Sequence, residues 1–330
     1  MGKIAFIFPG QGSQTVGMGK DLYDGTEEAK KLIHTADEAL GFSLSNIIFE
    51  GPQEELTLTY HAQPALLTTS TMLLEAFKTS GITPDFVAGH SLGEYSALVA
   101  AEVLSFEDAV VAVHKRGRYM DEAVPAGQGT MAAVLGMSAE DLEAVTAQIT
   151  SEGDAVQLAN INCPGQIVIS GTVNGVEKAG ALAKEKGAKR VIPLVVSGPF
   201  HSSLMKPAAE KLRDTLETVG FSDAKVPVVA NVTAKPVTDS QDIQNKLVEQ
   251  LYSPVRWEET VETLLAEGVD TFVEIGPGKV LSGLVKKVNR RATVYAVNDL
   301  TSLKSTIEKI PNSNHVRARK SVSCGIAVIR

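Results

Sequence analysis

The 330-residue chain has little cysteine, few aromatic residues and no long apolar run. Its two cysteines, Cys163 and Cys324, give no disulfide framework and suit a reducing compartment. No apolar run approaches the length of a membrane span, and the run at 4–8 is too short for a signal-peptide core. The net charge of −8 argues against a nucleic-acid-binding protein. We therefore expect a cytoplasmic protein that binds neither nucleic acid nor membrane.

The apolar fraction of 44% is ample for a core, and the length suits one large domain or two smaller ones. Over most of the chain, short apolar runs alternate with segments of helical periodicity, which predicts a parallel sheet with helices on both faces. The predicted strands lie at 3–8, 86–88, 226–232, 271–275 and 293–297. The predicted helices lie at 27–40, 63–80, 92–101, 105 to at least 120, 204–219, 239–251, 257–267, 280–288 and 303–310.

Residues 127–196 follow a different order of elements. Strands are predicted at 131–135, 156–161, 166–170 and 190–196, with helices at 138–149 and 174–186. This β-α-β-β-α-β order is that of a ferredoxin-like unit. We therefore predict an α/β domain at 1–126 and 197–311 that is interrupted by a ferredoxin-like subdomain at 127–196. Residues 312–330 match neither pattern and are predicted to be a disordered tail, with a basic partner-binding segment as the alternative.

A Gly-His-Ser-Leu-Gly segment at 89–93 lies between a predicted strand and a predicted helix. This is the setting of a nucleophile elbow, in which Ser91 occupies a tight turn and its hydroxyl stands above the sheet. Gly89 and Gly93 lack side chains that would clash where the strand and helix backbones approach. The alternative is a glycine-rich turn in which Ser91 caps the helix. The strand–turn–helix setting favours the nucleophile.

The loop at 9–14, Pro-Gly-Gln-Gly-Ser-Gln, follows the first predicted strand. It is either a plain turn or the source of a second backbone N–H for an oxyanion hole. A phosphate-binding loop is disfavoured because no Gly-Lys-Ser/Thr follows.

Two charged or basic residues could complete a site around Ser91. On the helix that begins at Ser105, Arg116 falls on the shoulder of the apolar face, which permits it to face a cleft. An ordinary surface arginine is the alternative. His201 lies in a loop at the predicted domain junction, where a nucleophilic serine would need a base, and a structural histidine is the alternative. His90 adjoins the serine at a strand end and is interpreted as a supporting group.

Taken together, the motifs resemble the malonyl-CoA:acyl carrier protein transacylase family of bacterial type II fatty-acid synthesis, over roughly residues 1–310. The matching segments are Phe-Pro-Gly-Gln-Gly-Ser-Gln at 8–14, Gly-His-Ser-Leu-Gly-Glu-Tyr at 89–95, Lys-Arg-Gly at 115–117, Asn-Ile-Asn at 160–162, Gln-Ile-Val-Ile-Ser-Gly at 166–171, His201 followed by Met-Lys-Pro-Ala at 205–208, Asn-Val-Thr-Ala at 231–234, Gln-Leu-Tyr at 250–252, and Glu-Ile-Gly-Pro-Gly at 274–278.

The resemblance implies an α/β-hydrolase-like domain with an inserted ferredoxin-like subdomain, in agreement with the pattern above. It implies that Ser91 is the nucleophile and His201 the base. It also implies that the backbone N–H groups of Gln11 and Leu92 form the oxyanion hole, and that Arg116 pairs with the malonyl carboxylate. Further site residues are implied: Gln250, whose carbonyl would orient His201; Phe200, which would crowd an α-methyl branch; His90; and Asn160, Gln166 and Asn231 as cleft-lining contacts.

The implied substrates are malonyl-CoA and acyl carrier protein, with no metal and no cofactor other than the CoA thioester itself, and we expect a monomer. An esterase or thioesterase with the same elbow is the main alternative. It would need an acidic residue between the serine and the histidine, for which Asp121, Asp141 and Asp154 are the candidates. A non-catalytic scaffold is the other alternative. A basic cluster, Lys286, Lys287, Arg290 and Arg291, is either a docking site for an acidic carrier protein or a solvated helix end.

Overall fold

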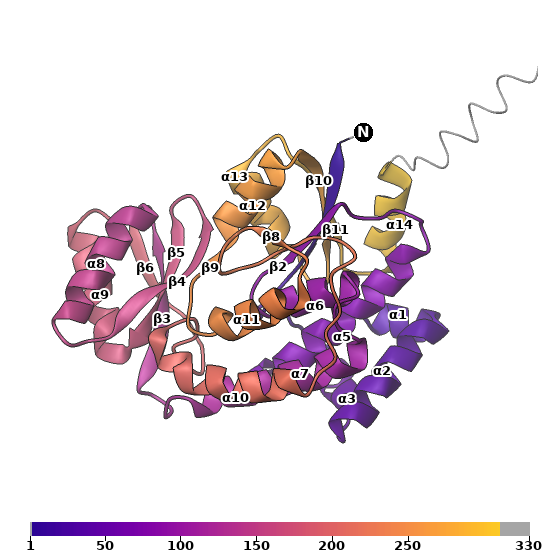
Figure 1. Ribbon diagram of the computed structural model, residues 1–330, viewed down its shortest axis with the longest axis horizontal. Coiled ribbons are helices and arrows are strands. Elements are labelled where there is room, and N and C mark those ends of the chain that lie inside the picture. Colours follow the sequence, from indigo (N-terminus) through magenta and orange to yellow (C-terminus); the bar gives the residue numbers. More distant parts are fainter. Residues whose placement is uncertain (1, 311–330) are drawn as a thin grey trace, which may run out of the picture.

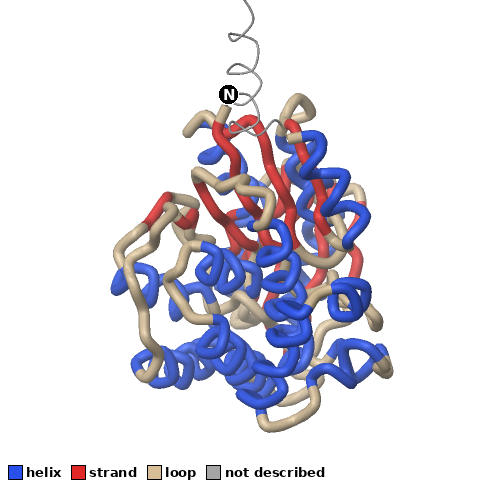
Figure 2. The backbone as a smooth tube through the Cα atoms, turned by 90° about the vertical axis from the view of Figure 1, so that its right-hand side faces the viewer, coloured by secondary structure: helices blue, strands red, loops and turns tan. Residues whose placement is uncertain are grey.

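The computed structural model describes residues 2–310, which form two sheets and the helices that cover them (Figures 1 and 2). The tail predicted at 312–330 lies outside the described residues. Within the described part of the chain, no helix has both the length and the apolarity needed to cross a bilayer.

The larger sheet has six strands in the order β11-β10-β1-β2-β7-β8. Their bounds are β1 Lys3–Phe8, β2 Phe86–Gly89, β7 Val228–Val229, β8 Pro236–Val237, β10 Val269–Ile275 and β11 Thr293–Val297. All neighbours from β11 to β7 run parallel, as predicted, but β8 pairs with β7 antiparallel. The strand predicted at 226–232 is shorter because the chain turns back after β7, with Ala234 at a φ of 52° and its N–H bonded to the carbonyl of Ala230.

Strand β1 divides the core of this part of the molecule into two layers. Phe6 and Phe8 pack into one cluster with the long helices, whereas Ala5 and Ile7 pack into another with Trp257. Alternate strand residues point to opposite faces, so each face buries its own helices, and Figure 2 shows helices on either side of the strands. On the first face the main helices are α2 Glu27–Leu40, α5 Thr59–Lys78, α6 Leu92–Ala100, α7 Phe106–Glu122, α10 Lys206–Glu217, α11 Ser240–Gln250 and α14 Leu300–Lys309; on the second they are α12 Trp257–Ala266 and α13 Val280–Val288.

Three short helices were not predicted, because they are too short to show a helical period. They are α1 Lys20–Gly25, α3 Leu44–Phe49 and α4 Gln53–Thr57. Helix α5 also begins earlier than predicted and contains Pro64. Proline has no N–H to bond the carbonyl four residues before it, and that carbonyl, of Tyr60, accepts instead from His114 Nδ1 at 2.7 Å. The contact with α7 therefore compensates for a proline that would otherwise end the helix.

The smaller sheet has the order β6-β3-β5-β4-β9. Its strands are β3 Gly129–Leu135, β4 Val156–Cys163, β5 Gln166–Thr172, β6 Arg190–Pro193 and β9 Val255–Arg256, and helices α8 Ala139–Ser151 and α9 Val173–Glu185 pack against it. The pairs β6–β3, β3–β5 and β5–β4 are antiparallel, and these four strands and two helices follow one another along the chain in the predicted order. The fifth, β9, comes from far downstream and runs parallel to β4, so it joins the small sheet to the rest of the molecule (Figure 1).

Candidate active site

Ser91 lies at the junction of β2 and α6 with φ 51° and ψ −109°. A positive φ is strained for a residue with a Cβ and costs about 1–3 kcal/mol. The glycines on either side are sterically required: a Cβ on Gly89 would lie 1.9 Å from the carbonyl oxygen of Gly93, and one on Gly93 would lie 2.1 Å from that of Phe8. The turn therefore has the geometry that an exposed hydroxyl above the sheet requires.

Asn231 holds this strained turn from beneath. Its Oδ1 accepts the backbone N–H of Ser91 at 2.8 Å, and its Nδ2 donates to the carbonyl of Gly89 at 2.7 Å. Its side chain is completely buried, so it supports the turn and does not line the cleft. Two bonds of about 1 kcal/mol each offset much of the strain.

His201 lies directly against the serine. Its Nε2 is 2.8 Å from Ser91 Oγ, and its Nδ1 is 2.8 Å from the backbone carbonyl oxygen of Gln250. A carbonyl only accepts, so Nδ1 carries the proton and Nε2 is free to receive the proton of the serine. Burial, reinforced by the positive charge of Arg116, lowers the pKa of His201 to about 3. The imidazole is therefore neutral near pH 7, as a general base must be.

None of the three candidate acids contacts this histidine. Asp121 accepts from Ser197 Oγ at 2.6 Å, Asp141 accepts from Ser138 Oγ at 2.7 Å, and Asp154 pairs with Lys178. The third partner of the serine and histidine is thus a backbone carbonyl. This arrangement gives no support to a hydrolase with an acidic third residue.

Arg116 is 1% exposed and extends from α7 to the nucleophile. Its Nη2 donates to Ser91 Oγ at 3.0 Å and to Gln250 Oε1 at 2.9 Å, while its Nη1 donates to Gln63 Oε1 at 2.7 Å. In the described chain it has no ion-pair partner, whereas Arg118 pairs with Glu122 on the surface. A buried cation without an anion is costly. The helical pattern had permitted this inward orientation, and the neighbours Lys115 and Arg118 are exposed as expected.

A cavity of about 390 Å³ opens above the serine. Six of the expected site residues line it: Gln11, His90, Ser91, Asn160, Phe200 and His201. Leu92, Arg116 and Gln250 are not in its lining, but Leu92 follows Ser91 in the chain, Arg116 contacts Ser91 and Gln250 contacts His201. Gln166 is not in the lining either, because it begins β5, where its Oε1 accepts from Lys287 Nζ at 2.8 Å.

Two backbone N–H groups near the serine are available to an oxyanion. Gln11 lies in the loop after β1, and Leu92 is the first residue of α6. Within residues 2–310, neither N–H has a hydrogen-bond acceptor. An N–H at a helix N-terminus is a good donor to a developing negative charge.

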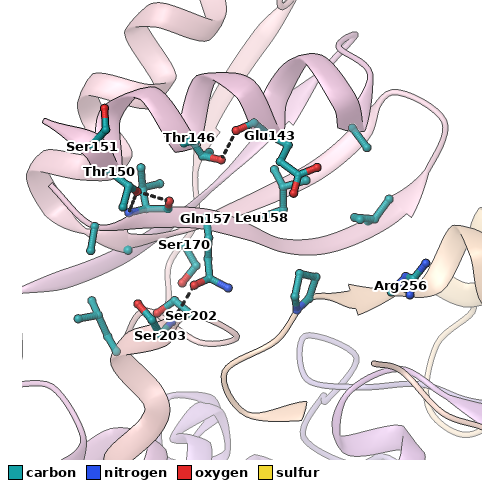
Figure 3. Close-up of a pocket in the computed structure, with 18 of the residues that line it drawn as sticks. Glu143, Thr146, Thr150, Ser151, Gln157, Leu158, Ser170, Ser202, Ser203 and Arg256 are labelled. Atoms are coloured by element: carbon teal, nitrogen blue, oxygen red, sulfur yellow. Dashed lines mark hydrogen bonds between the residues drawn. The ribbon is translucent and has the colours of Figure 1, made fainter. Parts of the chain in front are cut away.

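Several supporting residues were not among the expected site residues, although Asn162 belongs to the matching Asn-Ile-Asn segment at 160–162. Asn162 Oδ1 lies 2.8 Å from His90 Nε2, and Gln63 holds the guanidinium as described. Gln157 of β4 accepts the N–H of Ser203 at 2.8 Å and donates to the carbonyl of His201 at 3.3 Å. Figure 3 shows this glutamine at a hollow of about 960 Å³ between α8, β4 and the loop after His201. Gln157 thus connects the small sheet to the loop that carries His201. Amides of this kind are not identifiable from periodicity, because each matters only through a distant partner.

Comparison with known proteins agrees with this geometry. A family model described as the acyl transferase domain matches residues 5–319. The chain is 65% identical over 314 residues to a malonyl CoA-acyl carrier protein transacylase of Bacillus subtilis strain 168, covering 95% of this chain and 99% of the relative. An acyl carrier protein S-malonyltransferase from Vibrio cholerae superposes with a TM-score of 0.90 at 46% identity, covering 92% of this chain and 99% of that one.

A third similar structure is a malonyl-transacylase in complex with the acyl-carrier protein of a type II PKS. It superposes with a TM-score of 0.90 at 43% identity, covering 93% of this chain and 100% of that chain. The motifs and these similarities, which extend over nearly the whole chain, lead to the same assignment. The chain belongs to the family of malonyl-CoA:acyl carrier protein transacylases.

Proposed function

We propose that this protein transfers the malonyl group of malonyl-CoA to the phosphopantetheine thiol of acyl carrier protein through an ester on Ser91. One observation carries the proposal. Ser91 Oγ lies within hydrogen-bond distance both of a neutral base, His201 Nε2, and of the buried guanidinium of Arg116, which has no counter-ion among residues 2–310. A nucleophile and a binding group for a carboxylate therefore meet at one atom.

In the first half-reaction, His201 Nε2 takes the proton of Ser91 as Oγ attacks the thioester carbonyl carbon. The resulting oxyanion accepts from the N–H groups of Gln11 and Leu92, each worth about 3 kcal/mol in comparable sites. The C–S bond then breaks, and His201 returns its proton to the departing sulfur, so CoA leaves as a thiol. The carbonyl of Gln250 keeps the imidazolium oriented throughout.

In the second half-reaction, the phosphopantetheine thiol of the carrier protein enters the same cavity. His201 removes the proton of the thiol, the sulfur attacks the ester carbonyl, and the C–O bond to Ser91 breaks while the proton returns to Oγ. The enzyme is regenerated, and no water is consumed. The small cavity and the burial of His201 support a site that disfavours hydrolysis of the ester.

Arg116 would select the acyl group. A malonyl carboxylate would supply the anion that the guanidinium lacks, through two parallel hydrogen bonds. An acetyl group offers no such partner. Phe200, which is 6% exposed and lines the cavity, would crowd an α-methyl branch, so malonyl should be preferred to methylmalonyl.

We also propose that the chain forms two structural units, and that β9 of the larger unit extends the sheet of the smaller one. Residues 1–126 and 197–311 would form an α/β-hydrolase-like domain, and 127–196 a ferredoxin-like subdomain. The strand order β6-β3-β5-β4, with α8 and α9 packed on the sheet, supports this division. The expectations of a monomer, of a cytoplasmic location and of no cofactor stay predictions.

One labelling experiment tests the function. The protein is incubated with malonyl-CoA labelled in the malonyl group, and the label is followed on the protein, on added carrier protein and as free malonate. A transferase acylates Ser91 and passes the label to the carrier protein, and Ser91→Ala takes up none. Release of free malonate without transfer would indicate a hydrolase, and no reaction at all would indicate a scaffold.

A further inference from the structure

Glu94 is a buried carboxylate that the proposed reaction does not use. It lies in the first turn of α6, three residues after the nucleophile, and is 2% exposed. It is not in the lining of the cavity above Ser91. Its Oε2 accepts from Gln250 Nε2 at 2.7 Å and from the backbone N–H of Asn231 at 3.2 Å. Glu94 therefore contacts the groups around the nucleophile and not the cavity that would hold the substrate.

The contacts of the Gln250 side chain admit one orientation of its amide. On one side, Oε1 accepts from Arg116 Nη2 at 2.9 Å. On the other, Nε2 faces three oxygens: Glu94 Oε2 at 2.7 Å, Ser91 O at 3.1 Å and Asn231 Oδ1 at 3.2 Å. A reversed amide would place its NH₂ against the guanidinium and its oxygen against three acceptors. The bond to the carboxylate is the shortest of the set, and hydrogen bonds to charged groups are the stronger ones.

The main chain and the side chain of Gln250 serve different partners. Its backbone carbonyl accepts from His201 Nδ1, whereas its side chain holds Arg116. A change in the amide orientation would consequently move the guanidinium and leave the orientation of the base intact. Transfer of malonyl needs both groups, but transfer of acetyl needs only the base.

We propose that Glu94 is a positioning residue for acyl-group selectivity: it fixes the Gln250 amide, and the amide fixes Arg116 to receive a carboxylate. The inference rests on the proposed malonyl transfer. A direct Glu–Arg ion pair would neutralise the positive charge that a malonyl carboxylate is to meet. With an amide between the two charges, the guanidinium is held in place while remaining without an anion of its own.

Burial raises the pKa of Glu94 to about 7. Because a protonated carboxyl still has an oxygen that accepts a hydrogen bond, the contact with Gln250 does not depend on the charge. The essential feature is therefore the acceptor, and this decides the choice of variants.

The test compares Glu94→Met, which keeps the length of the side chain but replaces the oxygen acceptor with a weakly accepting thioether, with Glu94→Gln, which keeps an oxygen acceptor. The measurement is the ratio of kcat/KM for malonyl-CoA to that for acetyl-CoA. Glu94→Met should lower this ratio about tenfold or more, chiefly through malonyl-CoA, and Glu94→Gln should restore most of it. Glu274→Met is the matched control, because Glu274 is equally buried but caps α13 through the N–H groups of Leu281 and Ser282. It should lower Tm and leave the ratio unchanged.

The inference is overturned if both Glu94 variants keep the wild-type ratio, because Glu94 would then only stabilise the fold. It is also overturned if Glu94→Gln loses as much selectivity as Glu94→Met, because the acceptor would then not be the essential feature. If Glu94→Met does not fold, Glu94→Asp takes its place, because its shorter side chain cannot reach Gln250. A wild-type ratio in Glu94→Gln together with a lowered ratio in Glu94→Asp would then support the inference. A ratio in Glu94→Gln more than tenfold below wild type would reject it. Failure of the proposed function is distinct, since the wild-type protein would then not acylate Ser91.

Discussion

Arg116 and Ser91 are joined by a hydrogen bond of 3.0 Å between Nη2 and Oγ. The group that would recognise the substrate carboxylate thus lies at the atom that would be acylated. In a malonyl ester on Ser91, the free carboxylate is one methylene away from the ester carbonyl, so it would lie within reach of the guanidinium. Recognition of the acyl group and its attachment are therefore coupled by geometry.

Replacement of Arg116 should change acyl-group choice more than catalysis. Arg116→Ala leaves the malonyl carboxylate unpaired in a buried site, at a cost of several kcal/mol, so malonyl transfer should fall by at least a hundredfold while acetyl transfer is spared or rises. Arg116→Lys should recover only part, because an ammonium cannot form the paired bonds. The measurement is kcat/KM for malonyl-CoA and acetyl-CoA in each variant. An equal fall for both substrates would show that Arg116 is structural.

Replacement of His201 should lower activity and also make the fold less sensitive to acid. His201→Asn is the suitable variant, because asparagine tolerates the φ of 56° at this position and can donate to the carbonyl of Gln250. Loss of the base should slow acylation about 10²- to 10⁴-fold.

The stability effect follows from the pKa of His201, which is lowered to about 3 in the folded state. Between pH 6.5 and 3 the unfolded chain binds more protons at this histidine than the folded chain does, so the free energy of unfolding decreases as the pH falls, by up to about 1.4 kcal/mol for each pH unit. Urea unfolding at pH 6.5 and pH 4.5 should show a smaller acid loss in His201→Asn than in wild type. Identical losses would mean that the folded histidine titrates normally.

Removal of the support beneath the nucleophile should cost both stability and rate. Asn231→Ala leaves the N–H of Ser91 and the carbonyl of Gly89 without their partners, at about 1–3 kcal/mol for each buried group. Ser91 would no longer be held at its positive φ, so acylation per folded molecule should also fall. The control is Thr233→Val in the turn that contains Asn231, because Thr233 Oγ1 has no hydrogen-bond partner in the described structure. Comparable losses in the two variants would argue against a specific role for Asn231.

The basic cluster predicted to dock the carrier protein is divided by the structure. Lys286 Nζ donates to the carbonyl of Ala292 at 2.6 Å, and Lys287 Nζ donates to Gln166. All four residues are exposed, but the two lysine amines are engaged at the end of α13, whereas the side chains of Arg290 and Arg291 form no hydrogen bond or ion pair within residues 2–310. The arginines are consequently the better residues to test.

Reversal of Arg290 and Arg291 to glutamate should weaken the half-reaction with acidic carrier protein and reduce its salt dependence, with little change in the half-reaction with CoA. The control is the same reversal at Lys30 and Lys31 of α2, which lies across the molecule from α13 (Figure 1). Equal effects on both half-reactions, or from both pairs of reversals, would remove the docking hypothesis.

Much of the fold could be predicted from local patterns. The bounds of β1, α2, α13 and β11 agree with those predicted, because strand alternation and helical periodicity are properties of consecutive residues. The nucleophile turn was recognisable for a related reason. Two glycines at fixed spacing around a serine are required where a strand and a helix approach closely, and the steric need lies within five residues.

The remaining features depended on chain segments that meet only in the folded protein. Strand β7 is short because Asn231, three residues before Ala234, leaves the sheet and supports the turn at Ser91. The small sheet gains β9 from far downstream. The partner of His201 is a carbonyl, which every residue has, so the identity of residue 250 did not reveal it.

The burial of charge was likewise decided by tertiary structure. The sequence by itself placed Arg116 on the shoulder of the apolar face of its helix, a position from which the side chain can turn either inward or toward solvent. The amides of Gln63 and Gln250 hold its guanidinium, and Glu94 contacts the amide of Gln250. These contacts follow only from the packing of α5, α6, α7 and α11 around one point. A side-chain amide or carboxylate acquires its role from what it contacts, and such contacts are set by the folded chain as a whole.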